Sequence, residues 1–491
     1  MLTLDDVEGI CRALGAPCII PLVKALRNTE GLTPADVYAA LYRGQKHSFL
    51  LESAELGEKV ARYSFLGADP EDVITLKKGR MTVKDRSFET DRPLKELHSI
   101  LTQFKVHRGR LPKFFGGLLG YFSYDMVRYF EDIGGSSPDV LGHPDAQFMF
   151  VKDLIVFDHW RDEILLVSNI IVEDTASAEE EYGRACSQIS RMEELIKEVT
   201  PRSKGREARP RELVVKSNFE KEDFEEAVRK AKEHIYAGDI FQVVLSQRFE
   251  VDGEFDAFTV YEKLKEINPS PYMYLLDLGE IRIIGSSPEI LVKVDGRTVT
   301  VRPIAGTRPR GSDIVEDEEL AREMVNDEKE RAEHVMLVDL GRNDVGRVSR
   351  FGTVEVTEFF GIEKYSHVQH IISNVRGELR EGCSSFDVLR AAFPAGTVTG
   401  APKIRAMQII EELEPSRRGI YAGSVGYFSF DGNMDFAITI RTIVLQGGRA
   451  YVQAGAGIVA DSIPEREYEE TLNKGRGMVK ALELAGGDSG G

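Results

Sequence analysis

The stretch Gly285–Gly311 is GSSPEILVKVDGRTVTVRPIAGTRPRG, in which two apolar, β-branched runs flank Asp295-Gly296. An Asp-Gly dipeptide between two such runs predicts a β-hairpin with a two-residue loop. With that loop, Glu289 is predicted to face Arg302. The hairpin therefore predicts that the carboxyl of GSSPE lies beside the strand that leads into PIAGT.

A second hairpin is predicted for YFSF-DG-NMDF, with Asp431-Gly432 as its loop. Its register places Arg441 opposite Ala422 and next to Tyr421. A one-residue slip would turn these side chains to the other face of the sheet. Taken alone, Arg441 is more typical of a surface salt bridge than of a binding site.

A third hairpin, TIVLQ-GG-RAYVQ, has Gly447-Gly448 as its predicted loop. Its register places Arg441 opposite Ala454, next to the turn Gly455-Ala456-Gly457. Arginine can bind a carboxylate with two parallel hydrogen bonds, and glycines let backbone N–H groups approach an anion closely. The two registers together predict a carboxylate-binding site.

Two helices with paired carboxylates are predicted, Glu316–Leu340 and Asp461–Leu482. A solvated acidic face is the simpler interpretation of any single glutamate there. Paired carboxylates on two helices are nevertheless the ligands that Mg²⁺ prefers. The i, i+3 pairs are Glu330 with Glu333 and Glu467 with Glu470.

A helix and a strand are predicted to open the second half of the chain. Ser217 and Glu220 have the spacing of a capping box at the start of the helix. The strand follows at Ile240–Arg248, and its mixed face, which includes Gln242, suits the floor of a polar site.

Composition limits the function classes. The 491 residues carry a net charge of −18, which argues against a nucleic-acid binder. The four cysteines form no C-x-x-C pair, so neither a disulfide framework nor a zinc site is expected. The chain shows neither a signal peptide nor an apolar run long enough for a membrane span, so a cytoplasmic protein is expected.

The clearest break in composition is TPRSKGREARPRE at 200–212, which predicts a linker between regions 1–199 and 213–485. Gly455–Ala460, GAGIVA, matches the G-x-G-x-x-A pattern of dinucleotide-binding proteins. The neighbouring strands are predicted to form antiparallel hairpins, and no second parallel strand follows, so dinucleotide binding is disfavoured.

Several motifs together closely resemble the chorismate-utilising enzymes, and among them the large subunits of anthranilate synthases. The resemblance is dense in the second half and looser in the first, where it rests on LLES and GGLLGYFSYD. It implies an α+β fold, with two large, mostly antiparallel sheets forming a sandwich flanked by helices and an active-site cleft in the C-terminal half. The motifs of the second half are IFQVVLSQR (240–248), GSSPE (285–289), PIAGTRPRG (303–311), ERAEHVMLVDLGRND (330–344), FPAGTVTGAPKIRAM (393–407), YAGSVGYFSFDG (421–432) and AGAGIVADSIPEREYEETLNKG (454–475).

Two positions distinguish reactions within that family. Isochorismate and salicylate synthases carry a lysine, which activates water, where this chain has Gln242. Aminodeoxychorismate synthases typically carry a nucleophilic lysine in place of Ala305. The resemblance therefore implies that ammonia adds to the ring of chorismate, giving anthranilate and pyruvate in the first step of tryptophan synthesis.

The resemblance also implies roles for single residues. Glu289 would protonate the departing hydroxyl, for which it needs a raised pKa, and His367 in YSHVQH would assist the loss of pyruvate. Thr307 and Gln242 complete the expected catalytic set. Mg²⁺ would be held by Glu333 and Glu470, supported by Glu330 and Glu467. The expected substrate-binding residues are Gly306, Thr307, Tyr421, Arg441, Gly455, Ala456, Gly457 and Lys474.

Expected partners follow from the same resemblance. Ammonia would come from a glutamine amidotransferase subunit, in a heterotetramer. Ser53 of LLES and Pro271-Tyr272-Met273 match the site through which tryptophan inhibits the family. Two alternatives remain, an aminodeoxychorismate synthase component and a non-catalytic regulatory subunit that binds a metal or a ligand.

Overall fold

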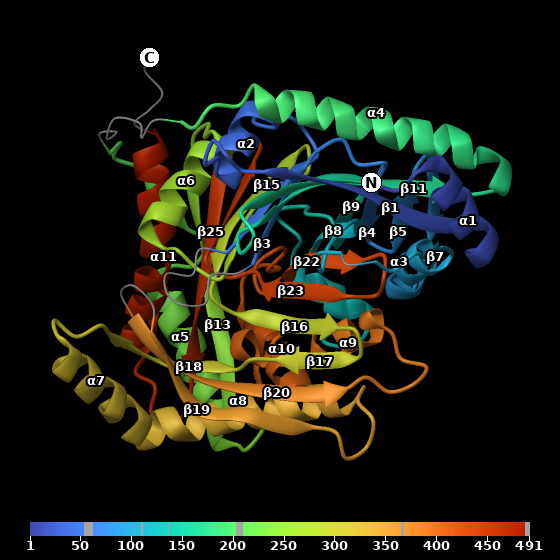
Figure 1. Ribbon diagram of the computed structural model, residues 1–491. Coiled ribbons are helices and arrows are strands. Elements are labelled where there is room, and N and C mark those ends of the chain that lie inside the picture. The colour runs from blue at the N-terminus through green and yellow to red at the C-terminus, as the bar shows by residue number, and fades with distance from the viewer. Residues whose placement is uncertain (54–61, 110, 136, 203–209, 365–367, 487–491) are drawn as a thin grey trace.

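The computed structural model describes residues 1–491 except 54–61, 110, 136, 203–209, 365–367 and 487–491. Two large sheets are surrounded by helices (Figure 1), and the described strands pair antiparallel except for β1 with β7. The predicted α+β fold is confirmed. The 13-stranded sheet contains, in spatial order, β12 (Val215–Ser217), β13 (Gln242–Asp252), β25 (Arg449–Ile458), β24 (Thr442–Gln446), β15 (Ile281–Ser287), β14 (Tyr272–Asp277), β2 (Ser48–Glu52), β3 (Tyr63–Gly67), β10 (Asp153–Asp158), β11 (Glu163–Val172), β1 (Cys18–Arg27) and β7 (Lys105–Val106), with β21 (Gly400–Ala401) beside β13.

The 12-stranded sheet includes the strands that carry the PIAGT motif and the second predicted hairpin. It contains, in order, β18 (Ile304–Pro309), β20 (Val368–Glu378), β17 (Thr298–Val301), β16 (Ile290–Asp295), β23 (Met434–Ile438), β22 (Ser424–Ser429), β8 (Gly117–Phe122), β9 (Ala146–Val151), β4 (Asp72–Lys77), β5 (Arg80–Val83) and β6 (Arg86–Glu89), with β19 (Glu355–Lys364) beside β20.

Helices cover the outer faces of both sheets (Figure 1). Among the described residues, no helix is both long and apolar enough to cross a bilayer. The helices are α1 (Leu4–Leu14), α2 (Pro34–Leu41), α3 (Pro93–Thr102), α4 (Ala178–Lys197), α5 (Lys221–Tyr236), α6 (Ala257–Ile267), α7 (Ile314–Asn326), α8 (Glu328–Gly346), α9 (Ser385–Ala392), α10 (Lys403–Leu413) and α11 (Pro464–Gly486), with 3₁₀ turns η1 (Tyr124–Tyr129), η2 (Thr175–Ser177) and η3 (Gly396–Val398).

The largest core lies between the two sheets. Phe65 enters it from the 13-stranded sheet and packs against Tyr427 of the 12-stranded sheet, with ring centres 6.0 Å apart. Phe428 and Phe436 lie on the other face of the 12-stranded sheet, where Phe428 stacks on Phe386 of α9. Both sheets mix strands from the two halves of the chain, because β2 pairs with β14 and β8 pairs with β22. The end of the predicted linker packs on α11, where Arg211 N–H donates to the Glu483 carbonyl at 2.9 Å.

The loop of the first hairpin is Gly296-Arg297, so the predicted Asp295-Gly296 loop is wrong. Asp295 stays in β16 and pairs with Thr298. Gly296 has φ +59°, which suits a turn with glycine at its first central position. Glu289 precedes β16 and does not pair with Arg302; its carbonyl accepts a hydrogen bond from Ile438.

The second hairpin has a three-residue loop, Phe430–Gly432, where two residues were predicted. Gly432 has φ +88°, as expected for a left-handed residue that closes a three-residue loop. The pairing therefore shifts by one, so that Ala422 donates to Thr439, and the predicted pairing with Arg441 is wrong. The Gly447-Gly448 loop is confirmed, but β24 begins only after Arg441.

The predicted helix Glu316–Leu340 is two helices, α7 and α8. Asp327 separates them because its side chain accepts from the backbone N–H groups of Lys329 and Glu330. The predicted capping box at Ser217 is also wrong. Ser217 lies in β12 and donates to Gln247 at 2.6 Å.

Candidate active site

The centre of the candidate site is the open backbone at the end of β25. Gly455 pairs with Ser246, and Gly457 pairs with Val244. A Cβ atom at Gly455 would lie 2.8 Å from the Tyr421 hydroxyl. One at Gly457 would lie 2.9 Å from the Gln242 amide nitrogen. Glycine at these two positions therefore lets the Tyr421 hydroxyl and the Gln242 amide lie directly against the strand.

Ala456 contributes to the same strand in a different way. It pairs with Leu245, and its methyl group is fully buried in the core beneath α5 and α10. The side chain therefore faces away from Gly455 and Gly457. Only the backbone of Ala456 can serve the predicted substrate site.

Lys474 joins the glycine turn to α11. Its ammonium donates to the Gly455 carbonyl at 3.0 Å and pairs with Glu470 at 2.6 Å. Arg441, which has φ +51°, donates to the Lys474 carbonyl at 3.4 Å. Burial lowers the pKa of Arg441, although Tyr421 and Glu470 oppose this effect. An anion bound beside Arg441 would stabilise this poorly solvated cation.

The PIAGT segment supplies the opposite side of the site. The pairing of β18 with β20 is broken between Ala305 and Arg308, and Gly306 has φ +64°. A Cβ atom at Gly306 would lie 3.2 Å from a Glu330 carboxylate oxygen. Ala305 is buried, whereas Thr307 is exposed.

His370 binds this turn and was missed from the sequence. Its Nδ1 donates to the Gly306 carbonyl at 2.7 Å and lies 3.2 Å from the Thr307 hydroxyl. Burial lowers the pKa of His370, and Arg441 lowers it further, so the imidazole is neutral at physiological pH. The alternation of side chains along a strand was the available signal. Because Gln369 is buried, its neighbour His370 must point to the opposite face. The predicted catalytic His367 lies outside the described residues.

Glu289 lies at the corner between β15 and β16 and is 9% exposed. Burial raises the pKa of Glu289 to about 8, although Thr397 and Lys474 oppose the rise. The carboxyl therefore carries a proton at neutral pH. This meets the requirement for a general acid, and Lys474 links Glu289 electrostatically to the glycine turn.

The four predicted metal ligands lie in two pairs on α8 and α11. Burial raises the pKa of Glu333 and of Glu467, and a neighbouring glutamate on the same helix raises each further. Lys329 and Lys474 oppose both rises. Glu330 pairs with Arg308 at 3.1 Å, and Glu333 accepts from Gln242 at 3.3 Å.

These residues fit a hard divalent cation by their chemistry. Glu467 is buried and Glu333 is half-buried, and carboxylates whose pKa is raised by burial and by a neighbouring glutamate gain from a nearby cation. Within the described ranges, however, no three His, Cys, Asp or Glu side chains converge as a ready-made metal site. The ion pairs Arg308–Glu330 and Lys474–Glu470 hold two of the four carboxylates.

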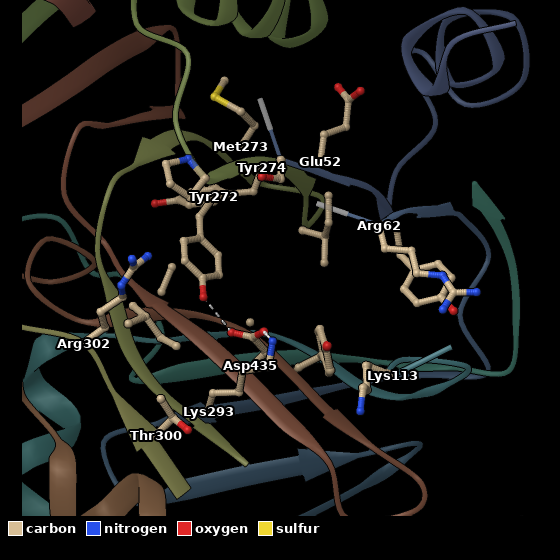
Figure 2. A pocket seen from close by; sticks show the side chains of 18 of the residues that line it. Glu52, Arg62, Lys113, Tyr272, Met273, Tyr274, Lys293, Thr300, Arg302 and Asp435 are labelled. Carbon is tan, nitrogen blue, oxygen red and sulfur yellow. Dashed lines mark hydrogen bonds and ion pairs between the residues drawn. The ribbon is translucent and has the colours of Figure 1, made fainter. Parts of the chain in front are cut away.

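The predicted tryptophan-sensing residues lie together in a separate cavity of about 870 Å³ between the sheets (Figure 2). Ser53, Pro271, Tyr272 and Met273 all line it. We call this space the effector cavity. Across it, the Tyr272 hydroxyl donates to Asp435 at 3.0 Å, and Asp435 pairs with Lys293 at 2.8 Å.

Only one layer of residues separates the effector cavity from Glu289. Ile290 and Arg302 line the effector cavity and also a second cavity of about 50 Å³ that contains Glu289 and Thr397. Pro288, on the other side of Glu289, lines the effector cavity as well. A ligand in the effector cavity would therefore touch the chain neighbours of Glu289.

Comparisons with known proteins agree with this arrangement. A model of the chorismate binding enzyme family matches residues 46–480. The chain is 49% identical to "Anthranilate synthase component 1" of Acetivibrio thermocellus over 99% of both chains. It is 44% identical to "Aminodeoxychorismate synthase component 1" of Bacillus subtilis, over 91% of this chain and 94% of that one. The crystal structure of anthranilate synthase component I from Streptococcus pneumoniae TIGR4 superposes with TM-score 0.77 at 39% identity, covering 92% of this chain and 98% of the other.

Proposed function

Because this chain belongs to the chorismate binding enzymes, we propose that it converts chorismate and ammonia to anthranilate and pyruvate, as the large subunit of an anthranilate synthase. The observation that carries the proposal is the pair Gln242 and Ala305. Neither side chain can act as a base or as a nucleophile. The Gln242 amide donates to Glu333 at 3.3 Å, and Ala305 is buried against β20. Ammonia, which is already a nucleophile, needs no such group.

The described residues support a division of labour on a dicarboxylate substrate. Arg441, Tyr421 and the backbone of Gly455–Gly457 would bind one carboxylate. The turn at Gly306-Thr307 would orient the substrate from the opposite side. Glu289 would give its proton to the ring hydroxyl, which leaves as water. Ammonia adds to the ring carbon beside the one that bears the carboxylate, the ring double bonds shift between the two positions, and the nitrogen gives up a proton to solvent.

Loss of pyruvate then restores the aromatic ring, and this step needs a base for the ring proton. His367 remains the prediction from the sequence. The geometry favours His370, because its neutral imidazole already touches Gly306 and Thr307. Substitution of each histidine by Gln distinguishes them, since only the true base gives accumulation of the amino-substituted intermediate.

We include Mg²⁺ in the proposal. Glu333 and Glu470, with Glu330 and Glu467, would hold it, and its charge would polarise the ring carboxylate of the substrate. The ammonia would come from a glutamine amidotransferase subunit in a heterotetramer in the cytoplasm. The described cysteines are free thiols, which suits a reducing compartment.

Feedback inhibition by tryptophan through the effector cavity belongs to the same proposal. The four residues expected to sense tryptophan line one cavity, which supports it. The wall shared through Ile290 and Arg302 gives a physical route to Glu289. Two sites are coupled when a ligand at one of them favours one conformation of the other.

An aminodeoxychorismate synthase component is the second candidate, favoured by the 44% identity to the Bacillus subtilis protein. Incubation with chorismate, ammonia and Mg²⁺ separates the two, because we expect fluorescent anthranilate. Accumulation of aminodeoxychorismate without anthranilate would support the second candidate. The absence of any turnover at saturating ammonia would instead support a non-catalytic regulatory subunit.

A further inference from the structure

A fully buried ion pair, Arg418 with Glu414, lies beneath the candidate substrate site. The two residues are 2% and 6% exposed. The guanidinium donates to the carboxylate twice, at 2.9 Å through Nε and at 2.6 Å through Nη2. This bidentate geometry fixes both side chains.

Arg418 also binds two backbone carbonyls that belong to different parts of the site. Nη2 donates to Val244 at 2.6 Å, and Nη1 donates to Val398 at 2.7 Å. Val244 pairs with Gly457 on β25. Val398 follows Thr397, which lines the small cavity that Glu289 also lines.

The same guanidinium stacks on two aromatic rings. Its central carbon lies 4.8 Å from the ring centre of Tyr124 and 5.7 Å from that of Tyr421. Tyr421 is the residue whose hydroxyl lies over Gly455. The Arg418 guanidinium therefore contacts the strand that pairs with the glycine turn, the turn that carries Thr397, and the ring of Tyr421.

Glu414 extends the contacts of the pair to the centre of β13. One carboxylate oxygen accepts from both the N–H and the hydroxyl of Ser246, each at 2.8 Å. Ser246 pairs with Gly455. The pair thus holds β13 at the two residues that face the glycines of the site.

Stability alone does not explain this pair, because two buried charges are often no more stabilising than apolar side chains of the same volume. Apolar side chains, however, could not satisfy the carbonyls of Val244 and Val398 or the N–H of Ser246. The distinctive role of the ion pair is to fix separate chain segments relative to one another.

We propose that Arg418 and Glu414 are positioning residues, which hold the Gly455–Gly457 backbone, the Thr397 turn and the Tyr421 ring in one arrangement for substrate carboxylate and general acid. The catalytic part rests on the proposed function. The positioning of these segments does not depend on it, so the two can fail separately.

The test is Arg418→Lys, with Arg417→Lys as the matched control. Arg417 contacts Ser137 and lies outside the proposed machinery. We expect Arg418→Lys to lower kcat about tenfold or more while the protein stays folded. We also expect the alkaline limb of the kcat–pH profile to move to lower pH, because water admitted beside Thr397 would reach Glu289. A kcat and a pH profile like those of the control would overturn the proposal.

Hydrogen–deuterium exchange provides a readout that does not need turnover. We expect faster exchange in peptides that contain Gly396–Val398 and Gly455–Gly457 in Arg418→Lys than in Arg417→Lys; equal exchange overturns the proposal. If wild-type protein produces no anthranilate, the proposed function fails, and this measurement still decides the positioning. If Arg418→Lys does not fold, the double variant Arg418→Met, Glu414→Gln removes both charges together. A kcat equal to that of wild type in this double variant would also overturn the proposal.

Discussion

The effector cavity and the candidate active site are built from neighbouring strands but differ in how they meet a ligand. The effector cavity holds about 870 Å³ of space, whereas the cavity at Glu289 holds about 50 Å³. In the effector cavity, Asp435 is already satisfied by Tyr272 and Lys293 on the walls. A ligand can therefore enter without breaking the internal contacts of the walls.

The active site depends on groups that bind one another. Lys474 holds Glu470, Arg308 holds Glu330, and Gln242 holds Glu333. Substrate and cation must replace these partners, so part of their binding energy is used to rearrange the site. The difference teaches that a ligand of the effector cavity enters existing space, whereas substrate and cation must displace ion pairs in the active site.

The comparison is tested most strongly by Glu289→Gln, which removes the proposed acid but keeps its shape. We expect kcat to fall about 10³-fold, within the usual contribution of a general acid. Tryptophan affinity, measured by calorimetry, should stay close to that of wild type, because Glu289 faces the other cavity. Glu280→Gln, an exposed change in the turn at the other end of β15, is the control. Equal kcat in the two variants would remove Glu289 from the mechanism.

Glu470→Gln should act through the metal. We expect the Mg²⁺ concentration for half-maximal activity to rise about 10–100-fold, together with a near-complete loss of activity at low Mg²⁺. Chelation by EDTA should abolish turnover in wild type. The exposed neighbour Glu469→Gln serves as the control. Activity that is independent of Mg²⁺ in all three proteins would contradict the proposed metal role.

Tyr272→Phe tests the effector side. It removes the hydrogen bond to Asp435 at 3.0 Å. Within the described part of the chain, Asp435 is then held by Lys293 alone, so this wall is less well fixed for a ligand, and a loss of about 1.4 kcal/mol of ligand binding corresponds to a tenfold change. We expect the tryptophan concentration for half-inhibition to rise about tenfold in an ammonia-dependent assay. Wild-type inhibition in the variant would show that tryptophan acts elsewhere.

The smallest effect is the roughly twofold fall in kcat expected between pH 7 and pH 8. Burial raises the pKa of Glu289 to about 8, so the protonated acid predominates below that pH. Above it, each pH unit removes about nine-tenths of the remaining protonated form, so kcat should halve near pH 8 and then fall about tenfold per unit. Saturating free ammonia at each pH avoids the titration of ammonium. A flat kcat up to pH 10 would refute the assignment.

The sequence predicted the sheets and their hairpins better than their registers. The Gly447-Gly448 loop was correct because both residues have positive φ, as the two-residue turn requires. The two Asp-Gly loops were misplaced, since each contains only one glycine and the flanking residues decide its place in the turn. The break at Asp327 also had a local signal, an aspartate followed by helix-forming residues.

The candidate site was predicted mainly through motifs, and its missed members show why. Nothing local in the sequence distinguishes Arg418 from its neighbour Arg417; the structure does so through the distant carbonyl of Val244. His370 was passed over because its partner, Gly306, lies 64 positions away. Contacts at such separation depend on the pairing of whole strands, which short patterns do not encode.

The mixing of both halves of the chain in each sheet has a consequence for synthesis on the ribosome. Strand β2 can complete its pairing only after β14 has been synthesised. Strand β8 can do so only after β22 (Ser424–Ser429), which follows it by some three hundred residues. Until those segments emerge, the early strands expose unpaired edges that can join other chains. Long-range pairing of this kind also slows folding. The nascent N-terminal half therefore needs protection from aggregation until translation is nearly complete, and a chain that stops before β22 cannot complete either sheet.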